Sequence, residues 1–405
     1  MLFSEKLRRF AGCHLAHFEV FHIGLEAFVE LRLDSRQIGR RLGVSTLLEG
    51  SVRKSGNRLR IAVQMTGADS GYQLWGERFD REMSDVFAVQ DEIARNIVQA
   101  LQVKLTPEER GALQKPPTSD VQAYDYYLRG RKFYYHYNRE DIQFAIQFFS
   151  RAVELDPAFV LAHAGLADCW SYLYLYAERS ENARRQADTA SLRAVELDPA
   201  SAQAQASRAV SLSLSRRDEE AERAFQAAIR LDPGLFEAHY FYARHAFVRG
   251  ELRKAVQLYE QAMRVRPEDY QAPLLVAQIY DDLGRPDDAR AVRQRGIRNA
   301  EEHLKLNPDD ARAVYMAANG LAALGERERS REWAQRALVM EPDEPMLLYN
   351  VACIYSLLGS AEEAIDCLDR AVRSGLTQKG WLEHDSNLDP LRSHPRFQEL
   401  LRQLN

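Results

Sequence analysis

A short sequence that ends in proline recurs along most of this chain and constrains its fold more than any other feature. The heptapeptide Arg151–Pro157 occurs again without a change at Arg193–Pro199. Four related copies follow, and they end at Pro233, Pro267, Pro308 and Pro342. The six prolines are therefore 42, 34, 34, 41 and 34 residues apart. Because a 34-residue period is typical of helix–turn–helix repeat arrays, we predict an α-solenoid over most of the chain.

Each period has the same internal pattern. In residues 236–269 a first apolar helix is followed by a turn at Gly250 and by a second helix closed by Pro267. Small residues are expected where the two helices cross, because larger side chains would push them apart. They recur at Ala145, Ala221, Ala255, Ala289 and Ala364. The pattern resembles the tetratricopeptide repeat and predicts seven units within residues 124–378, namely 126–159, 160–201, 202–235, 236–269, 270–310, 311–344 and 345–378.

Two units are longer than the period. The second carries 8 extra residues and the fifth carries 7. Seven helical residues make about two turns, so we predict longer second helices, running over about Pro286–Leu306 in the fifth unit. The alternative is a longer loop between the helices around Ala177–Asn182.

The last 27 residues (379–405) are expected to cap the array, because the last hydrophobic face of a solenoid would otherwise meet water. They resemble the end-of-group segment that closes such arrays in the same family. We predict a helix that starts on Pro390 and is capped by Asp389. The residues expected to cover the last unit are Trp381, Leu388, Leu391, Phe397 and Leu400.

A different pattern precedes the array. Strands are predicted over Thr46–Lys54, Arg58–Thr66 and Tyr72–Asp80, joined by short turns rich in Gly, Asn and Ser. The middle strand alternates, with apolar side chains on one face (Leu59, Ile61, Val63, Met65) and polar ones on the other (Arg58, Arg60, Gln64, Thr66). A helix with an apolar face at Val86, Val89, Ile93, Ile97 and Leu101 is expected to cover this small antiparallel α/β domain.

Four blocks of this segment resemble a known bacterial family. They are Ile38–Val44, Leu48–Arg53, Leu74–Asp80 and Val86–Ile93. Together they are similar to the TolB-like amino-terminal domain and cover residues 34–105, followed by a linker over 106–123. Residues 1–33 match nothing in that pattern, and we hypothesise that the reading frame is truncated or locally shifted there.

The sequence offers little support for catalysis. It has no phosphate-binding loop, no dinucleotide fingerprint, no H-E-x-x-H pair and no nucleophile elbow. Cys13, His14, His17 and His22 cluster near the start but lack the paired spacing of structural zinc ligands. We therefore predict a protein that is not an enzyme and needs no cofactor or metal.

Charge and composition bound the partners and the compartment. The net charge of −5 gives no overall attraction to nucleic acid or to anionic membrane. No run of about 18 apolar residues and no signal peptide is present. The four cysteines show no paired spacing. A soluble, cytoplasmic protein with a protein or peptide partner is expected.

The resemblance to tetratricopeptide arrays implies that first helices line a concave groove. Projecting the family's groove positions onto this sequence gives Tyr240, Arg244, Phe247, Gln278, Tyr315, Asn319, Tyr349 and Asn350. Asn319 and Asn350 match asparagines that bind an extended ligand's backbone in peptide-binding members. The basic residues of the family's carboxylate clamp are absent, with Tyr315 in place of a lysine, so recognition of a C-terminal carboxylate is not expected. Asparagine is also common there in repeats without a known ligand.

Aromatic residues crowd the first two units beyond what one helix face can bury. Those expected at an interface are Tyr134, Tyr137, Trp170 and Tyr174. We predict that they pack the sheet domain against the repeats or bind a partner. The favoured function is a non-catalytic scaffold that binds a peptide or protein. The alternative is the regulatory half of a bacterial signalling protein whose cyclase, kinase or winged-helix part lies elsewhere.

Overall fold

The computed structural model describes residues 34, 36–37, 46–55, 58–68, 70–82, 92–93, 96, 117–177, 179–376 and 379–404. The chain divides into two compact units, 1–128 with 154–159, and 129–153 with 160–405. The predicted helix over 86–101 lies outside the described residues, apart from isolated helical positions at 92–93 and 96. The cluster of Cys13, His14, His17 and His22 also lies outside them.

The first unit contains a three-stranded antiparallel sheet in the order β1 (Thr46–Ser55), β2 (Arg58–Gly67) and β3 (Gln73–Glu82). All three strands confirm the sequence prediction. The apolar face of β2 is buried at Leu59, Ile61, Val63 and Met65. On its opposite face, Arg60 pairs with Asp80 of β3 at 3.1 Å.

Thr66 departs from the predicted alternation. It was expected on the exposed face of β2, but it is buried. The register with β3 shifts between Met65 and Thr66, so that Leu74 of β3 has no partner on β2. An extra residue of this kind locally ends the strict alternation of side chains.

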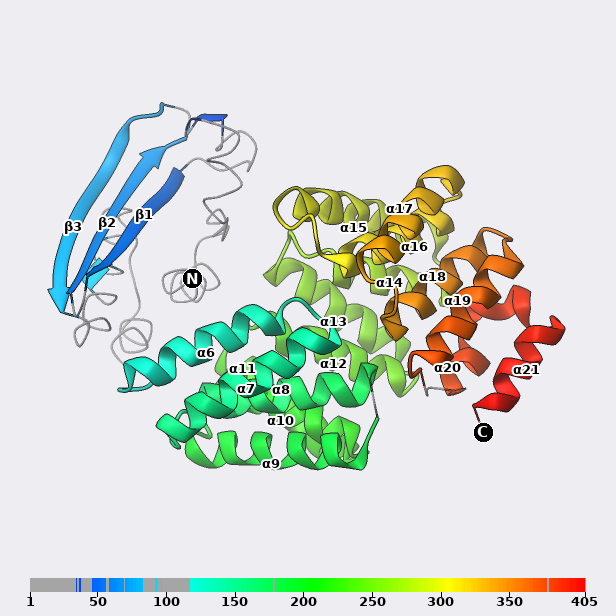
Figure 1. The fold of residues 1–405 in the computed structure, drawn as a ribbon, viewed down its shortest axis with the longest axis horizontal. Coiled ribbons are helices and arrows are strands. Elements are labelled where there is room, and N and C mark those ends of the chain that lie inside the picture. Colours follow the sequence, from blue (N-terminus) through cyan, green and yellow to red (C-terminus); the bar gives the residue numbers. More distant parts are fainter. Residues whose placement is uncertain are drawn as a thin grey trace. The chain divides into compact units, whose positions relative to one another are not determined.

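Seven successive helix pairs follow in the described chain from Val121 onwards (Figure 1). They are α6 (Val121–Tyr134) and α7 (Arg139–Leu155), α8 (Val160–Tyr176) and α9 (Glu181–Leu197), α10 (Ala202–Leu214) and α11 (Asp218–Leu231), α12 (Phe236–Val248) and α13 (Leu252–Val265), α14 (Gln271–Asp282) and α15 (Pro286–Leu306), α16 (Ala311–Ala323) and α17 (Arg327–Met340), and α18 (Pro345–Leu357) and α19 (Ala361–Arg373). The predicted solenoid of seven units is confirmed.

Helix α6 begins inside the segment predicted as a linker. The side chain of Asp120 accepts the backbone N–H groups of Gln122 and Ala123 at 2.8 and 2.9 Å. The first N–H groups of a helix have no acceptor within the helix, and an aspartate just before the helix accepts their hydrogen bonds.

The repeated Asp-Pro has a structural role at the end of the second helices of the first three pairs. The Asp198 N–H still donates to the carbonyl of Ala194, while its side chain accepts the N–H of Ala200 at 3.0 Å. Asp232 does the same for Gly234 at 2.9 Å. The aspartate thus turns the chain while the following proline prevents further helix.

The extra residues of the two long units are placed differently. Helix α15 has 21 residues and runs over Pro286–Leu306, as predicted for the fifth unit. In the second unit the prediction is only partly right, because α8 and α9 both have 17 residues whereas α10 and α11 have 13 and 14. The lengthening there is shared between the two helices.

After the seventh pair the chain forms α20 (Lys379–His384), the 3₁₀ helix η2 (Ser386–Leu391) and α21 (Pro395–Gln403). The predicted helix start at Pro390 is wrong. Asp385 caps η2 by accepting the N–H of Asn387 at 2.9 Å, Pro390 lies inside η2, and α21 starts on Pro395.

The apolar residues of this segment behave as expected for a cap. Leu388, Leu391, Phe397 and Leu400 are buried in one core with side chains of α18 and α19. The side chain of Trp381 lies outside the described part.

Gly165 is required where α8 meets α7. A Cβ atom at Gly165 would lie 2.7 Å from Cζ of Phe149, whose side chain is fully buried. We expect Gly165→Ala to lower the free energy of unfolding by about 1–3 kcal/mol, although alanine favours helix. Urea unfolding measures this. Gly380→Ala, with no atom within 4 Å of its added Cβ, should cause no loss. Equal effects of the two changes would contradict the close contact.

Phe397 is the largest buried side chain of the terminal segment. We expect Phe397→Ala to reduce stability by about 3–5 kcal/mol, because it leaves a cavity against the last pair. Glu399→Ala on the exposed face of α21 should stay within about 0.5 kcal/mol of wild type. Thermal unfolding of the two variants provides the comparison, and a small effect at Phe397 would refute the capping role.

Candidate functional site

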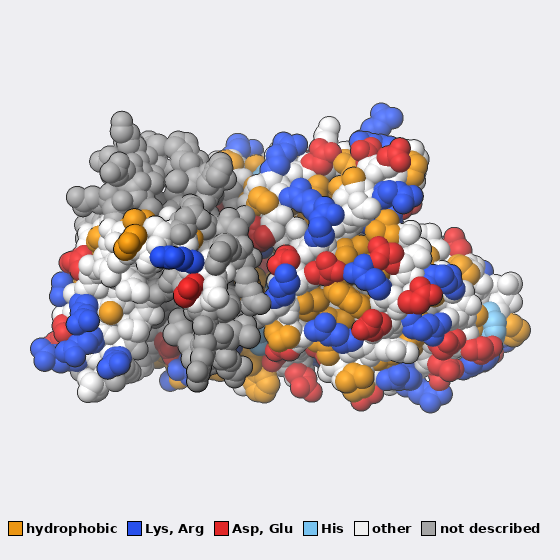
Figure 2. Space-filling model, turned by 90° about the horizontal axis from the view of Figure 1, so that it is seen from above, with side chains coloured by type: hydrophobic (Ala, Val, Ile, Leu, Met, Phe, Trp, Pro, Cys, Tyr) orange, Lys and Arg blue, Asp and Glu red, His pale blue; other side chains and the backbone are white. Residues whose placement is uncertain are grey.

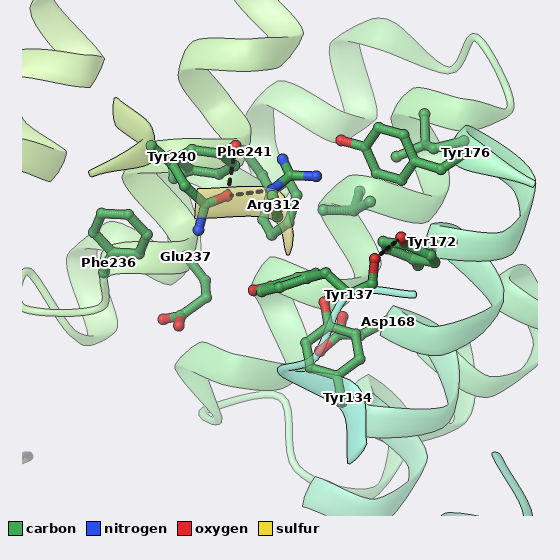
Figure 3. A pocket seen from close by; sticks show the side chains of 14 residues that line it. Tyr134, Tyr137, Asp168, Tyr172, Tyr176, Phe236, Glu237, Tyr240, Phe241 and Arg312 are labelled. Atoms are coloured by element: carbon green, nitrogen blue, oxygen red, sulfur yellow. Dashed lines mark hydrogen bonds between the residues drawn. The ribbon is translucent and has the colours of Figure 1, made fainter. Parts of the chain in front are cut away.

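A pocket lies on the face formed by the first helices of the array (Figure 3). It encloses about 570 Å³ of empty space, part of which is open to solvent. The lining residues are Tyr134, Tyr137, Asp168, Ser171, Tyr172, Leu175, Tyr176, Val210, Phe236, Glu237, Tyr240, Phe241, Gln271 and Arg312. All of them belong to α6, the loop after it, α8, α10, α12, α14 or α16, and none belongs to a second helix.

The array curves towards this face. The guanidinium carbon of Arg312 on α16 lies 5.7 Å from the ring centre of Tyr176 on α8 and 5.4 Å from that of Tyr137. Helices α8 and α16 belong to the second and sixth pairs. Side chains from pairs so far apart can meet only on the inner side of a curved array, so the pocket is concave.

Tyrosines form one wall of the pocket. The ring centres of Tyr137 and Tyr172 are 6.1 Å apart, and those of Tyr172 and Tyr176 are 4.9 Å apart. The hydroxyl of Tyr172 donates to the backbone carbonyl of Tyr137, which has a φ of 54°. A bulky residue rarely adopts this left-handed conformation, and its surroundings must hold it there.

Burial keeps these phenols neutral. It raises the pKa of Tyr137, Tyr172 and Tyr240 well above the usual value of a tyrosine. The wall therefore offers apolar rings together with hydroxyl groups that remain protonated.

Two arginines flank this wall. Arg312 donates from Nε to Oε1 of Gln271 at 3.1 Å and from Nη1 to the hydroxyl of Tyr315 at 3.4 Å. The guanidinium carbon of Arg244 on α12 lies 4.7 Å from the ring centre of Tyr176. Burial lowers the pKa of Arg244 to about 10, and the charge of Arg312 acts in the same direction. Both side chains remain cationic at neutral pH.

The acidic residues of the pocket lie apart from Arg312 in Figure 3. Glu237 pairs with Arg266 at 3.1 Å. Burial opposes its ionisation, but the charge of Arg266 outweighs that effect and holds the pKa of the Glu237 carboxyl below its usual value. Asp168 lies near Tyr134 and accepts a long hydrogen bond of 3.4 Å from Gln203. Burial raises the pKa of the Asp168 carboxyl to about 7.

Three residues proposed from the sequence line this pocket, namely Tyr134, Tyr137 and Tyr240. Arg244 joins it through the ring of Tyr176. The structure thus brings one end of the predicted aromatic patch together with one end of the predicted groove. Six other proposed residues lie outside the pocket lining. Phe247 is exposed, Tyr315 is buried, and the half-buried ones are Gln278, Asn319, Trp170 and Tyr174.

The remaining two proposed residues are engaged elsewhere. The hydroxyl of Tyr349 donates to Asp385 at 2.6 Å, and Nδ2 of Asn350 donates to the carbonyl of Met346 on its own helix at 2.7 Å. Three residues of the pocket lining were not predicted from the sequence, namely Glu237, Gln271 and Arg312. Each is the second residue of its unit, which is one of the family's groove positions, so the signal was present.

Comparison with known proteins agrees with this architecture. Two family models described as tetratricopeptide repeat match residues 246–302 and 315–376. The array carries tetratricopeptide repeats. The tetratricopeptide array also resembles the structure of the human IFIT1 dimer with m7Gppp-AAAA, with a TM-score of 0.51 and 16% identity. That likeness covers 80% of this chain and 74% of the other, and it shows the fold alone.

Among curated proteins, putative adenylate cyclase 3 of Rhizobium meliloti (strain 1021) is 37% identical over 193 residues, which cover 47% of this chain and 33% of the relative. Transcriptional regulator HilA of Salmonella typhimurium is 24% identical over 217 residues, covering 53% of this chain and 38% of that protein. The chain thus spans less than half the length of these relatives.

Charged side chains elsewhere on the tetratricopeptide array are mixed. Figure 2 shows one face on which acidic and basic side chains are interspersed over the helices. Within the described residues, no helix is both long and apolar enough to span a membrane. No group of three or more His, Cys, Asp or Glu side chains in that part of the chain could hold a metal ion.

The Asp168 carboxyl makes stability depend on pH. Its folded pKa of about 7 lies above the value of about 3.9 in an unfolded chain. The fold therefore loses stability as pH rises from about 4 to about 7, where only the unfolded chain is fully ionised. The shift corresponds to about 4 kcal/mol at most, and we expect about half of it because the carboxyl is only partly buried.

Asp168→Asn should remove this contribution. Between about pH 4.5 and about pH 7.5, wild type should lose on the order of 2 kcal/mol more than the variant in urea unfolding. Other buried carboxyls also make stability depend on pH, such as Glu341, whose pKa burial raises to about 7. Their contribution is the same in wild type and variant, so it cancels in the comparison. Identical pH profiles would show that the carboxyl titrates normally.

Proposed function

We propose that this chain is a non-catalytic interaction protein that binds a peptide or a protein segment in the concave pocket. The observation that carries the proposal is the pocket itself, because first helices from six pairs contribute to one aromatic, partly open cavity. Tetratricopeptide repeats are in general a binding fold, which supports an interaction role, but fold alone does not determine function.

The chemistry of the pocket suits a peptide. Tyrosine rings supply large apolar contact area with little loss of side-chain freedom, and their hydroxyls can bind backbone amides. Residues of this type dominate the energy of many protein interfaces when they are clustered and shielded from water. The pocket also contains charges of both signs, which can orient a bound chain.

Truncation of a pocket tyrosine tests this proposal. Peptides selected from a random library on the immobilised full chain should bind Tyr176→Ala at least about tenfold more weakly than wild type, as expected for a central interface residue. Phe144→Ala on α7 removes an exposed aromatic outside the pocket and should leave affinity unchanged. Circular dichroism verifies that both variants fold. Selected peptides that bind all three proteins equally would place the binding surface elsewhere.

A second function is favoured by the curated relatives. The matches to a putative adenylate cyclase and to a transcriptional regulator support the idea that this chain is the regulatory part of a cytoplasmic bacterial signalling protein. In that arrangement residues 34–105 would be the TolB-like domain, residues 124–378 the sensory array and residues 379–405 its cap. An in-frame cyclase, kinase or DNA-binding segment in the adjoining genomic sequence would support this assignment, and a stop codon between them would oppose it.

A further inference from the structure

Arg244 and Arg312 form an unusual pair at the pocket, which Arg312 lines and Arg244 reaches through the ring of Tyr176. They come from α12 and α16, yet both guanidinium groups lie over the ring of Tyr176, at 4.7 and 5.7 Å from its centre. Tyr176 is therefore a contact that the two cations share, and the charge of Arg312 is one of the causes that lower the pKa of Arg244. Stacking on tyrosine favours each cation separately, but it does not neutralise their mutual repulsion.

Neither arginine forms an ion pair within 4 Å in the described part of the chain. This is unusual here, because many other arginines of the array do so, including Arg208, Arg266 and Arg293. The hydrogen bonds of Arg312 go only to neutral groups, on Gln271 and Tyr315. Nη2 of Arg312 has no hydrogen-bond partner among the described residues.

Asp310, two residues before Arg312, and the two carboxyls of the pocket lining are engaged with other partners. Asp310 acts on the charge of Arg312 from a distance, but its oxygens accept from His303 at 2.7 Å and from the N–H of Ala313 at 3.0 Å. Glu237 pairs with Arg266, and Asp168 lies beside Tyr134. Among the lining residues, Arg312 thus lies apart from the carboxyls of Asp168 and Glu237 (Figure 3).

Two half-buried guanidinium groups without a counterion are costly, because burial weakens their hydration and their charges repel. An anion in contact with them would relieve both effects. We infer that Arg244 and Arg312 bind the side-chain carboxylate of an aspartate or glutamate in a peptide held by the pocket. This inference rests on the proposed peptide-binding function and specifies the ligand's chemistry.

A carboxylate matches this site better than a phosphate. A guanidinium edge binds the two oxygens of a carboxylate in a planar arrangement. Only Arg312 of the two arginines lines the cavity, and it has already used Nε and Nη1. A phosphate dianion would bring a second negative charge into a pocket that already holds the carboxylate of Glu237.

Fixed-residue peptide libraries test the inference. Four pools of amidated peptides, randomised except for a central glutamate, glutamine, lysine or phosphoserine, are passed over the immobilised full chain. We expect the glutamate pool to be retained about tenfold more than the glutamine and lysine pools, as a charge-assisted hydrogen-bonded pair would produce. Arg312→Gln and Arg244→Gln should each reduce this preference to about threefold or less.

A matched control separates the site from the overall charge. Arg290→Gln and Arg298→Gln remove the same charge from exposed positions on α15 and should retain the full preference. If Arg312→Gln does not fold by circular dichroism, Arg312→Lys takes its place. It keeps the charge but loses the planar fork, and it should weaken the preference.

The outcomes distinguish the inference from the proposed function. Three outcomes would overturn the inference and leave peptide binding intact. The peptides are retained without a preference for glutamate, or only the phosphoserine pool is preferred, or the glutamate preference survives in the Arg312 and Arg244 variants. If none of the four pools is retained above bare resin, the proposed function fails and the inference fails with it.

Discussion

The close crossing of the two helices within each pair is the contact on which the rest of the array depends. The second helices bring a small residue to this crossing, at Ala145, Ala221, Ala255, Ala289 and Ala364, and all five are fully buried. In the sixth pair the equivalent residue is Ser330, whose hydroxyl donates to the carbonyl of Ala318 at 2.8 Å. A hydroxyl is thus tolerated there because it is small and has a partner. Regular crossings of this kind let pairs stack with similar geometry, and the accumulated rotation curves the array.

This curvature explains what could and could not be predicted from the sequence. The period and the prolines are local, so they predicted the helix pairs, the long α15 and the cap residues. Arg312 lies at a recognised groove position, but its proximity to Tyr137 and Tyr176 depends on small rotations summed over four pairs. No local sequence pattern predicts the total of these rotations. The helix start at Pro390 was wrong for a different reason, since Asp385 and Pro395 offered competing start signals nearby.

The C-terminal segment also limits the inner face. Tyr349 was expected to line the groove, yet its hydroxyl binds Asp385, and Cys353 approaches the same carboxylate at 3.6 Å. Helix η2 packs on α18, with Leu388 and Leu391 in the shared core. The segment that shields the last pair from water therefore also occupies part of the surface that first helices present in earlier pairs. Position within a repeat indicates a groove residue only where no cap covers it.

The pocket has a mechanical consequence because its walls belong to pairs that are distant along the chain. The width of the pocket depends on how strongly the superhelix curves between these pairs. Pulling on the ends of the array would separate Arg312 from Tyr176 by slight rotations at several interfaces, before any helix had to unwind. Conversely, anything that joined α8 to α16 across the pocket would resist extension of the pairs between them. Shape and elasticity are therefore linked in this array through the contacts of Arg312 with Tyr137 and Tyr176.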